Sequence, residues 1–328
     1  METDISVRLQ KIDEIREEIS SYKSIDKNLP NKLKDFYRVS SVYSTNAIEG
    51  NTLTESETKV VIEDGITIGG KSVREHLEAI NSAKAYDFIY TLLNSDIITE
   101  KDILQIHKLV LSGIDDENAG RYRQEAVFIS GTEYAPPSYK DVAELISGFT
   151  EKLNKRGKEH PIIKAADMHA EFESIHPFID GNGRTGRFIL SLELIRNGYS
   201  PFLAYPVKRL DYINSLRIYQ TKNDKTEIRK FVVENVYETA KALRRYLNNA
   251  IGKSESESIQ QDDAFTKLQK YNEIYQKDGL DAALKQIKDD KRDMNWIMFH
   301  KDKLFPDRTR TEVEKAVKEL DRDRGMER

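Results

Sequence analysis

Apolar residues recur at intervals of three and four along most of the chain, which is the period of a helix with one buried face. Residues 5–24 carry one such stripe, and residues 31–49 carry a second. Similar stripes predict further helices near residues 72–94, 100–111, 139–154, 161–174, 184–197, 209–221 and 225–248. The pattern therefore predicts an all-α fold class with few strands.

Hydroxyl residues followed three positions later by an acid mark the starts of several of these helices, because such pairs can close a capping box. The pairs are Thr54 with Glu57, Thr99 with Asp102, and Ser138 with Asp141. The one β signal is the apolar run 126–129, which a glycine and two prolines follow within eight residues. It predicts a small β-hairpin that projects between helices.

Residues 252–262 are polar and lack any apolar period, which indicates a linker. Beyond it, residues 263–328 show helical stretches near 264–276, 280–289 and 310–322, with an apolar cluster at 296–299. We expect a small C-terminal helical or winged-helix-like module there. Its charges nearly cancel, so binding to nucleic acid gains no electrostatic support, and a packing or oligomerisation role is favoured.

Composition excludes several classes of function. The 328 residues include 52 Lys and Arg against 56 Asp and Glu, so no global basic field attracts nucleic acid or an anionic membrane. The absence of cysteine excludes disulfides, a thiol nucleophile and cysteine-ligated metals. Since the N-terminus does not resemble a secretory signal and no run of 18 apolar residues occurs, we expect a cytoplasmic protein without a membrane span.

Residues 176–187 carry the densest chemistry, with the sequence His-Pro-Phe-Ile-Asp-Gly-Asn-Gly-Arg-Thr-Gly-Arg. Gly181 and Gly183 flank Asn182 directly before an apolar helix, so backbone N–H groups can converge there on an anion. The positive end of the helix dipole points at the same place, which favours phosphate. The segment therefore predicts a phosphate site.

Four side chains around this turn add to that chemistry. Arg184 and Arg187 lie three residues apart in the first turns of the helix, where a positive charge opposes the dipole unless an anion is bound. Asp180 supplies a carboxylate that suits Mg²⁺. His176 titrates near neutral pH and can take a proton from an attacking hydroxyl.

Each feature alone has a simpler explanation. Asn-Gly is a common tight-turn dipeptide, and a single histidine is more often structural than catalytic. We place the five other histidines, at positions 76, 107, 160, 169 and 300, in that structural class, although His169 could pack near the site. The combination of base, carboxylate, glycine turn and paired arginines within twelve residues is what favours a functional site.

These twelve residues resemble the complete signature of the Fic-domain family, with no substitution at its defining positions. The resemblance implies an all-helical Fic core, and the family's usual activity is transfer of AMP from ATP to a hydroxyl side chain of a target protein. It implies a division into an N-terminal helical region with an inhibitory helix, residues 1–95, and a Fic core, residues 96–251.

The resemblance also implies a role for each position of the motif. His176 would be the base that activates the hydroxyl, and Asp180 would hold Mg²⁺. Phe178 would be the buried anchor of the loop. The ATP-binding residues would be Gly181, Asn182 and Gly183 at the α- and β-phosphates, Arg184 at the β region, Arg187 at the γ-phosphate, and Asn223 at the adenine.

The segment from Thr45 to Asn51 resembles the family's inhibitory motif, in which the glutamate, here Glu49, pairs with the second motif arginine, here Arg187. That pairing would obstruct productive placement of the γ-phosphate. Considered alone, the segment is a helix that ends at Glu49, with Gly50 as its left-handed stop. Some relatives use this glutamate to orient a water that removes AMP, and that activity stays open here.

The predicted hairpin at 126–137 falls where the family places its flap, a segment that adds a strand to the target and sets its hydroxyl against the base. Val127, Phe128 and Ile129 would form the target-docking flap. An ordinary hairpin that covers the core is the alternative, and the two interpretations can coexist.

We therefore expect a protein adenylyltransferase that uses ATP and Mg²⁺, modifies Ser, Thr or Tyr of a target protein and is autoinhibited by Glu49. A regulatory module that binds nucleotide without turnover is one alternative, although a pure binder does not need the base His176. Transfer of UMP, phosphate or phosphocholine is another. A homodimer follows from family likeness alone, and the sequence identifies neither the target nor the signal that relieves inhibition.

Overall fold

A computed structural model describes residues 2–22, 28–129, 132–155 and 157–251, together with shorter parts of 271–317. The chain divides into two compact units, Met1–Leu247 and Asn248–Arg328. The predicted linker at 252–262 lies outside the described residues. The predicted regions 1–95 and 96–251 fall within the first unit except for residues 248–251, and the division between the two regions stays a prediction.

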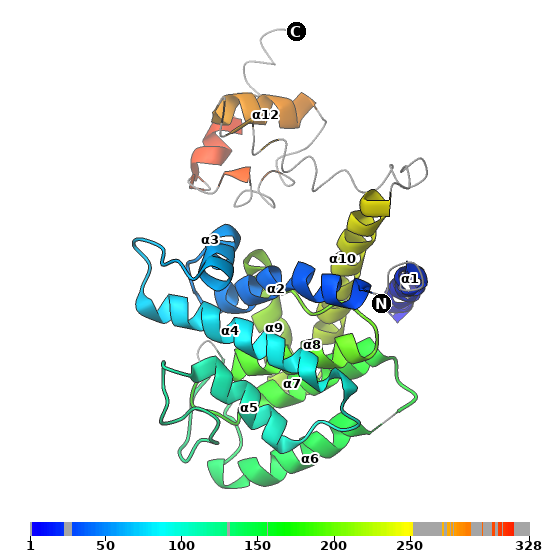
Figure 1. Cartoon of the computed structure of the whole chain (residues 1–328), viewed down its shortest axis with the longest axis vertical. Helices are drawn as coiled ribbons and strands as arrows, with labels where there is room; N and C mark the ends of the chain where they lie inside the picture. The colour runs from blue at the N-terminus through cyan, green and yellow to red at the C-terminus, as the bar shows by residue number, and fades with distance from the viewer. Residues whose placement is uncertain are drawn as a thin grey trace. The chain divides into compact units, whose positions relative to one another are not determined.

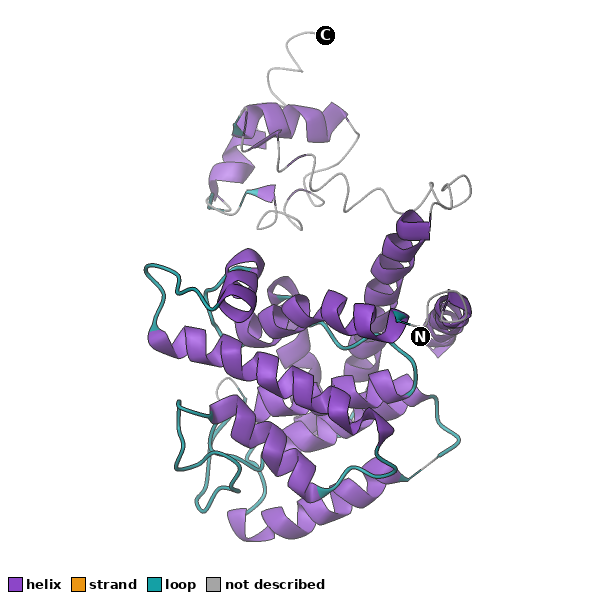
Figure 2. Ribbon diagram, viewed as in Figure 1, coloured by secondary structure: helices purple, strands orange, loops and turns teal. Residues whose placement is uncertain are grey.

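Helices make up most of the first unit, as the apolar period predicts, and no strand occurs among the described residues (Figures 1 and 2). Each helix predicted between residues 5 and 248 is present within a few residues of its expected bounds. The α-helices are α1 (Glu2–Tyr22), α2 (Leu29–Ile48), α3 (Glu55–Lys59), α4 (Val73–Thr91), α5 (Glu100–Leu111), α6 (Val142–Asn154), α7 (Pro161–Ile175), α8 (Asn182–Arg196), α9 (Arg209–Lys222) and α10 (Thr226–Ile251). Short helical turns η1 (Val60–Asp64), η2 (Leu92–Asn94), η3 (Tyr139–Asp141) and η4 (Pro206–Lys208) complete the described set.

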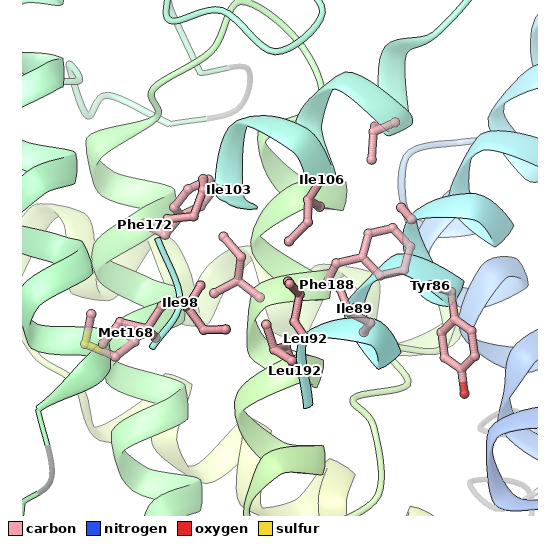
Figure 3. Close-up of a cluster of buried hydrophobic side chains, with 14 of the residues drawn as sticks. Tyr86, Ile89, Leu92, Ile98, Ile103, Ile106, Met168, Phe172, Phe188 and Leu192 are labelled. Atoms are coloured by element: carbon pink, nitrogen blue, oxygen red, sulfur yellow. The ribbon is translucent and has the colours of Figure 1, made fainter. Parts of the chain in front are cut away.

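Helix α8 lies at the centre of the first unit, where it packs against α7, α5, α4 and α2. Its buried side chains include Phe188 and Leu192, which meet Phe172 and Met168 from α7 and Ile106 from α5 (Figure 3). Because α8 is buried along most of its length, its first turn is held rigidly against its neighbours. The twelve-residue motif joins α7 to α8, so the core fixes both ends of the candidate site.

Two of the predicted helix starts are confirmed as capping boxes. The hydroxyls of Thr54 and Thr99 each accept a hydrogen bond from the backbone N–H three residues later. The carboxylates of Glu57 and Asp102 in turn accept from the backbone N–H of Thr54 and Thr99. Ser138 behaves differently: its hydroxyl accepts the N–H of Lys140, and a short 3₁₀ turn precedes α6. The tighter turn of a 3₁₀ helix brings the N–H two residues on within reach of the hydroxyl.

The predicted β-hairpin is not confirmed, because residues 126–129 and 132–137 contain no strand. Arg123 gives a physical reason. Its guanidinium donates to the carbonyls of Glu125 and Pro137, so these groups are taken by a side chain instead of pairing across two strands. Pro136 and Pro137 also lack the N–H that a ladder requires.

The second unit contains α12 (Leu280–Asp289), where the sequence predicts a helix, and a helical segment at 311–317. Its described core includes Leu284, Ile287, Phe305 and Val313. Most of the predicted stretches 264–276 and 296–299 lie outside the described residues. The winged-helix-like character of this unit stays a prediction.

Removal of the cap on α5 tests the capping assignment. Thr99→Ala should lower the free energy of unfolding by about 1 kcal/mol, because the N–H of Asp102 loses its acceptor. The measurement is the midpoint of urea unfolding of the full chain. Thr99→Ser keeps the hydroxyl and should stay close to the wild type, and equal losses in the two variants would contradict the assignment.

Candidate active site

The motif forms a tight loop between α7 and α8. His176 adopts the left-handed conformation with φ 48°, and Gly181 does so with φ 76° at the start of α8. The Asn182 side chain closes the loop, since its Oδ1 accepts the N–H of Phe178 at 2.9 Å and its Nδ2 donates to the Phe178 carbonyl at 2.8 Å. The Asn182 side chain therefore holds the loop backbone in place.

Phe178 is fully buried and anchors this loop, as the resemblance implies. Its ring stacks on His107 of α5, with ring centroids 3.6 Å apart and planes within 3°. His107 lies 2.9 Å from the Asp180 carbonyl through Nε2, while its Nδ1 accepts the N–H of Gly120 at 3.0 Å. This pattern places the proton on Nε2 and gives His107 the structural role that the sequence analysis assigned to it.

His176 has the surroundings of a neutral base. Its Nδ1 lies 3.3 Å from the carbonyl of Glu173, one turn earlier on α7, so a proton on Nδ1 leaves Nε2 free to accept another. Burial lowers the pKa of His176 from 6.5 to about 4. The imidazole is therefore neutral at neutral pH, with Nε2 unprotonated, which is the state that a general base requires.

Arg123 connects His176 to the segment of the predicted flap. This buried guanidinium donates to the carbonyl of His176 at 2.9 Å and to the carbonyls of Glu125 and Pro137, which flank the segment. Within that segment Phe128 is 92% exposed, and Val127 and Ile129 are half-buried. The sequence analysis assigned no role to Arg123, which lies in the Gly-Arg-Tyr-Arg stretch at 120–123, shortly before the segment.

Asp180 belongs to a closed ring of alternating charges that the sequence did not predict. Its carboxylate accepts a hydrogen bond from Arg74 of α4 at 2.9 Å and another from Arg184 of α8 at 3.2 Å. Glu78 of α4 completes the ring, with Oε1 3.1 Å from Arg74 and 3.5 Å from Arg184. Burial raises and the Arg184 charge lowers the pKa of Asp180, and the net shift is downward, so Asp180 is ionised at neutral pH.

Arg184 is only 3% exposed, and its Nε and Nη1 have no hydrogen-bond acceptor among the described residues. Buried guanidinium N–H groups are costly to leave unpaired, so the side chain is suited to bind an incoming anion. These buried N–H groups without an acceptor fit the phosphates of ATP, which would supply anionic oxygens at this position.

Arg187 is equally buried, and it donates hydrogen bonds to Thr45 of α2 and to Glu49, which directly follows that helix. Its Nε donates to the Thr45 hydroxyl at 2.9 Å, and Nη2 donates to the Thr45 carbonyl at 2.9 Å and to Glu49 Oε1 at 2.6 Å. The two segments that the sequence analysis singled out, 45–51 and 176–187, are thus brought together through an ion pair.

The Glu49 carboxylate lies directly over Gly183, where a methyl group would overlap Oε1. This is the first turn of α8, whose unpaired N–H groups and dipole attract anions. Burial opposes ionisation of Glu49, but the Arg187 charge outweighs it, so the pKa of Glu49 is lowered and the group is ionised. Glu49 therefore stands as an anion at the position predicted for phosphate.

Among the described residues, no hydrogen bond or ion pair joins the predicted ATP-binding residue Asn223 to the motif. It ends α9 in the left-handed conformation with φ 53°, its backbone N–H bonds to Tyr219, and its side chain is exposed. Its contact with adenine stays a prediction.

Two buried groups lie behind the motif: Glu173, which the sequence analysis did not single out, and His169, which it placed in the structural class near the site. Glu173 has its pKa raised to about 7 by burial, and its Oε1 has no partner among the described residues. His169 lies 2.7 Å from the Tyr212 hydroxyl through Nε2 and is held neutral by burial. Gly186 makes room for them, because a methyl there would lie 2.5 Å from Glu173 and 3.3 Å from His169.

The fit of Mg²⁺ rests on one carboxylate. In the part of the chain that the structure describes, no group of three or more metal-ligating side chains occurs. Asp180 is 44% exposed at the edge of the anion site, and Mg²⁺ commonly takes one or two protein carboxylates, with water and phosphate as its other ligands. The residues present therefore fit a magnesium ion that binds together with a nucleotide.

Known proteins resemble this chain over the same region. The Fic/DOC family model matches residues 97–194. A protein adenylyltransferase Fic from Nematostella vectensis is 35% identical over 228 residues, which are 68% of this chain and 52% of that protein. One from Drosophila mojavensis is 34% identical over 243 residues, or 73% of this chain and 47% of that protein. The chain thus spans about half the length of the curated relatives it matches.

Solved structures agree with this similarity. Residues 134–508 of Fic-1 from C. elegans are 30% identical with a TM-score of 0.69, and the match covers 76% of this chain and 74% of that chain. The chain therefore belongs to the Fic/DOC family, and the resemblance of its twelve-residue motif is confirmed.

None of the described helices has the length and apolar character needed to cross a membrane.

Burial of His176 makes a prediction about its titration. We expect a midpoint near 4, because the protonated form is disfavoured in the folded protein, so the imidazole stays neutral at about pH 6. The measurement is a pH titration of ring-carbon NMR signals in ¹³C-histidine-labelled protein, with His176→Ala to assign the signal. A midpoint at the ordinary 6.5 would contradict the buried, neutral base.

Proposed function

We propose that this protein is an adenylyltransferase that moves AMP from ATP to a Ser, Thr or Tyr hydroxyl of a target protein. The observation that carries the proposal is the neutral His176 beside a helix N-terminus with two buried arginines. The relatives named protein adenylyltransferase Fic support the same reaction.

In this reaction Nε2 of His176 accepts the proton of the target hydroxyl while the hydroxyl oxygen bonds to the α-phosphorus. The bond between the α-phosphorus and the oxygen that leads to the β-phosphate breaks, and pyrophosphate leaves. Arg184 and Arg187 stabilise the charge that develops on the leaving group, together with the N–H groups of the first turn of α8. Asp180 would hold Mg²⁺, which neutralises phosphate charge when it is bound.

We further propose that Glu49 inhibits this reaction by occupying the anion site. It neutralises Arg187 at 2.6 Å and covers Gly183, so a phosphate can reach neither group until Glu49 withdraws. The Glu49 side chain remains 40% exposed, which leaves it a path into solvent without unfolding of the core.

The exposed segment around Phe128 is the proposed docking site for the target. It offers backbone groups and one nearly free aromatic ring, and Arg123 fixes its ends relative to His176. A backbone-paired target would be positioned with little side-chain selectivity. The homodimer expected from family likeness and the cytoplasmic location stay predictions.

Intact-mass analysis after incubation with Mg²⁺ and ATP tests the activity without a known target, provided that the relaxed enzyme modifies itself. Glu49→Gly should gain AMP at least tenfold faster than the wild type, because Arg187 and the first turn of α8 become free for phosphate. Glu49→Gly/His176→Ala should gain none, since the base is lost. Glu49→Gln controls for side-chain volume and should show an intermediate gain.

The same experiment separates the alternatives. Addition of phosphate or UMP from ATP or UTP would assign a different transferred group. Confirmed ATP binding without any added mass would favour a nucleotide-binding module, and loss of AMP from a pre-modified protein would reveal removal of AMP.

A second prediction concerns Thr45, which helps hold Arg187 on α2. Thr45→Val removes one hydrogen bond to this charged group and keeps the volume of the side chain. Because such a bond contributes about 1.5–3 kcal/mol, which corresponds to roughly 10- to 150-fold, self-modification should rise by about tenfold or more and stay below that of Glu49→Gly. Ser44→Ala, one residue earlier, should leave the rate at the wild-type value, and equal rates for the wild type and Thr45→Val would remove Thr45 from the inhibitory contact.

A further inference from the structure

The two oxygens of Asp180 have different partners. Oδ1 accepts the N–H of Gly181 at 2.6 Å and Arg184 at 3.2 Å, and both donors belong to the motif itself. Oδ2 accepts only Arg74 at 2.9 Å among the described residues. A cation that binds Asp180 without disturbing the loop must therefore take Oδ2, the oxygen that Arg74 occupies.

Arg74 is held near Asp180 in a way that lets its head leave. Its Nε is fixed to Glu78 at 3.1 Å, one turn later on α4, while its Nη2 reaches Asp180. Glu78 is buried and is held in turn by Asn51 Nδ2 at 2.9 Å, so it is a fixed anchor. The Arg74 side chain is 59% exposed, so its Nη2 can swing into solvent about the anchored Nε.

We infer that Arg74 is a placeholder cation for Asp180. Arg74 competes with the divalent ion for this carboxylate and so lowers the metal affinity of the nucleotide-free site. This inference rests on the proposed function, because it takes Asp180 as the magnesium ligand. Arg74 is a positioning residue: it keeps the carboxylate oriented and neutralised until the metal arrives with the nucleotide. The charged groups that face Asp180 are Arg74, Arg184 and Glu49.

Removal of the placeholder should strengthen metal binding. Arg74→Gln takes away the positive charge beside Oδ2 and keeps most of the side-chain length. The exposed Arg74–Asp180 pair contributes little to stability, but the Arg74 charge repels a divalent ion bound to Asp180. We therefore expect Arg74→Gln to bind the metal about two- to tenfold more tightly than the wild type. Arg74→Lys keeps the charge and should bind the metal about as weakly as the wild type.

The experiment uses the full chain without nucleotide and Mn²⁺ as the probe, because free Mn²⁺ is counted directly by electron paramagnetic resonance. The dissociation constant is measured for the wild type, Arg74→Gln, Arg74→Lys and Asp180→Asn. Arg229→Gln is the matched control, since it breaks an arginine–aspartate pair with Asp167 away from the motif and should leave the constant unchanged.

Tighter binding in Arg74→Gln that disappears in Arg74→Gln/Asp180→Asn would support the inference. Unchanged or weaker binding in Arg74→Gln, with binding lost in Asp180→Asn, would overturn the placeholder and leave the metal site intact. Binding that persists equally in Asp180→Asn would overturn the placeholder together with the metal assignment. Self-modification of Glu49→Gly, measured separately, reports on the proposed function whichever result is found.

Discussion

The buried positive charge of Arg187 is the constraint on which the rest of the site depends. A guanidinium in the interior, near the N-terminus of a helix, is unfavourable without an anion, both because it is desolvated and because it opposes the helix dipole. Thr45 of α2 meets this need with two oxygens, and Glu49, directly after α2, meets it with its carboxylate. A nucleotide phosphate would meet the same need, so in the proposed mechanism one charge would serve both an inhibited and an active arrangement, and the two would exclude each other.

The geometry around that charge is set by side chains that hold the motif backbone in place. Asn182 closes the loop on Phe178, His107 stacks beneath it, and Arg123 holds the carbonyl of His176. These contacts keep His176 in a left-handed conformation that a non-glycine residue rarely adopts. Since each support is buried, the loop is ordered before any ligand arrives, which is the pre-organisation that transfer at a phosphorus requires.

The sequence predicted what depends on local patterns and on one dense motif. The helices follow from apolar spacing, and the boxes at Thr54 and Thr99 follow from three-residue pairs. The ion pair of Arg187 with Glu49 was expected from the resemblance alone, since 138 residues separate the partners. Arg74 and Glu78 were missed because a charged residue on an amphipathic helix resembles any solvated one, and only the packing of α4 against α8 brings them to Asp180. The hairpin is not confirmed, and the contacts of Arg123 with the backbone of that segment cannot be seen in a propensity pattern.

Asn51 connects Glu49 to the charge ring around Asp180. It lies two residues after Glu49 in the same turn and holds Glu78, so the segment that pairs with Arg187 also steadies the acid to which Arg74 is fixed. A displacement of that turn large enough to withdraw Glu49 would pull on Asn51, loosen Glu78 and weaken the hold of Arg74 on Asp180. Phosphate binding and metal binding would then become favourable together, although the two sites contact α2 and α4 through different side chains. Coupling of this kind needs only the contiguous packing of charged side chains that the structure contains.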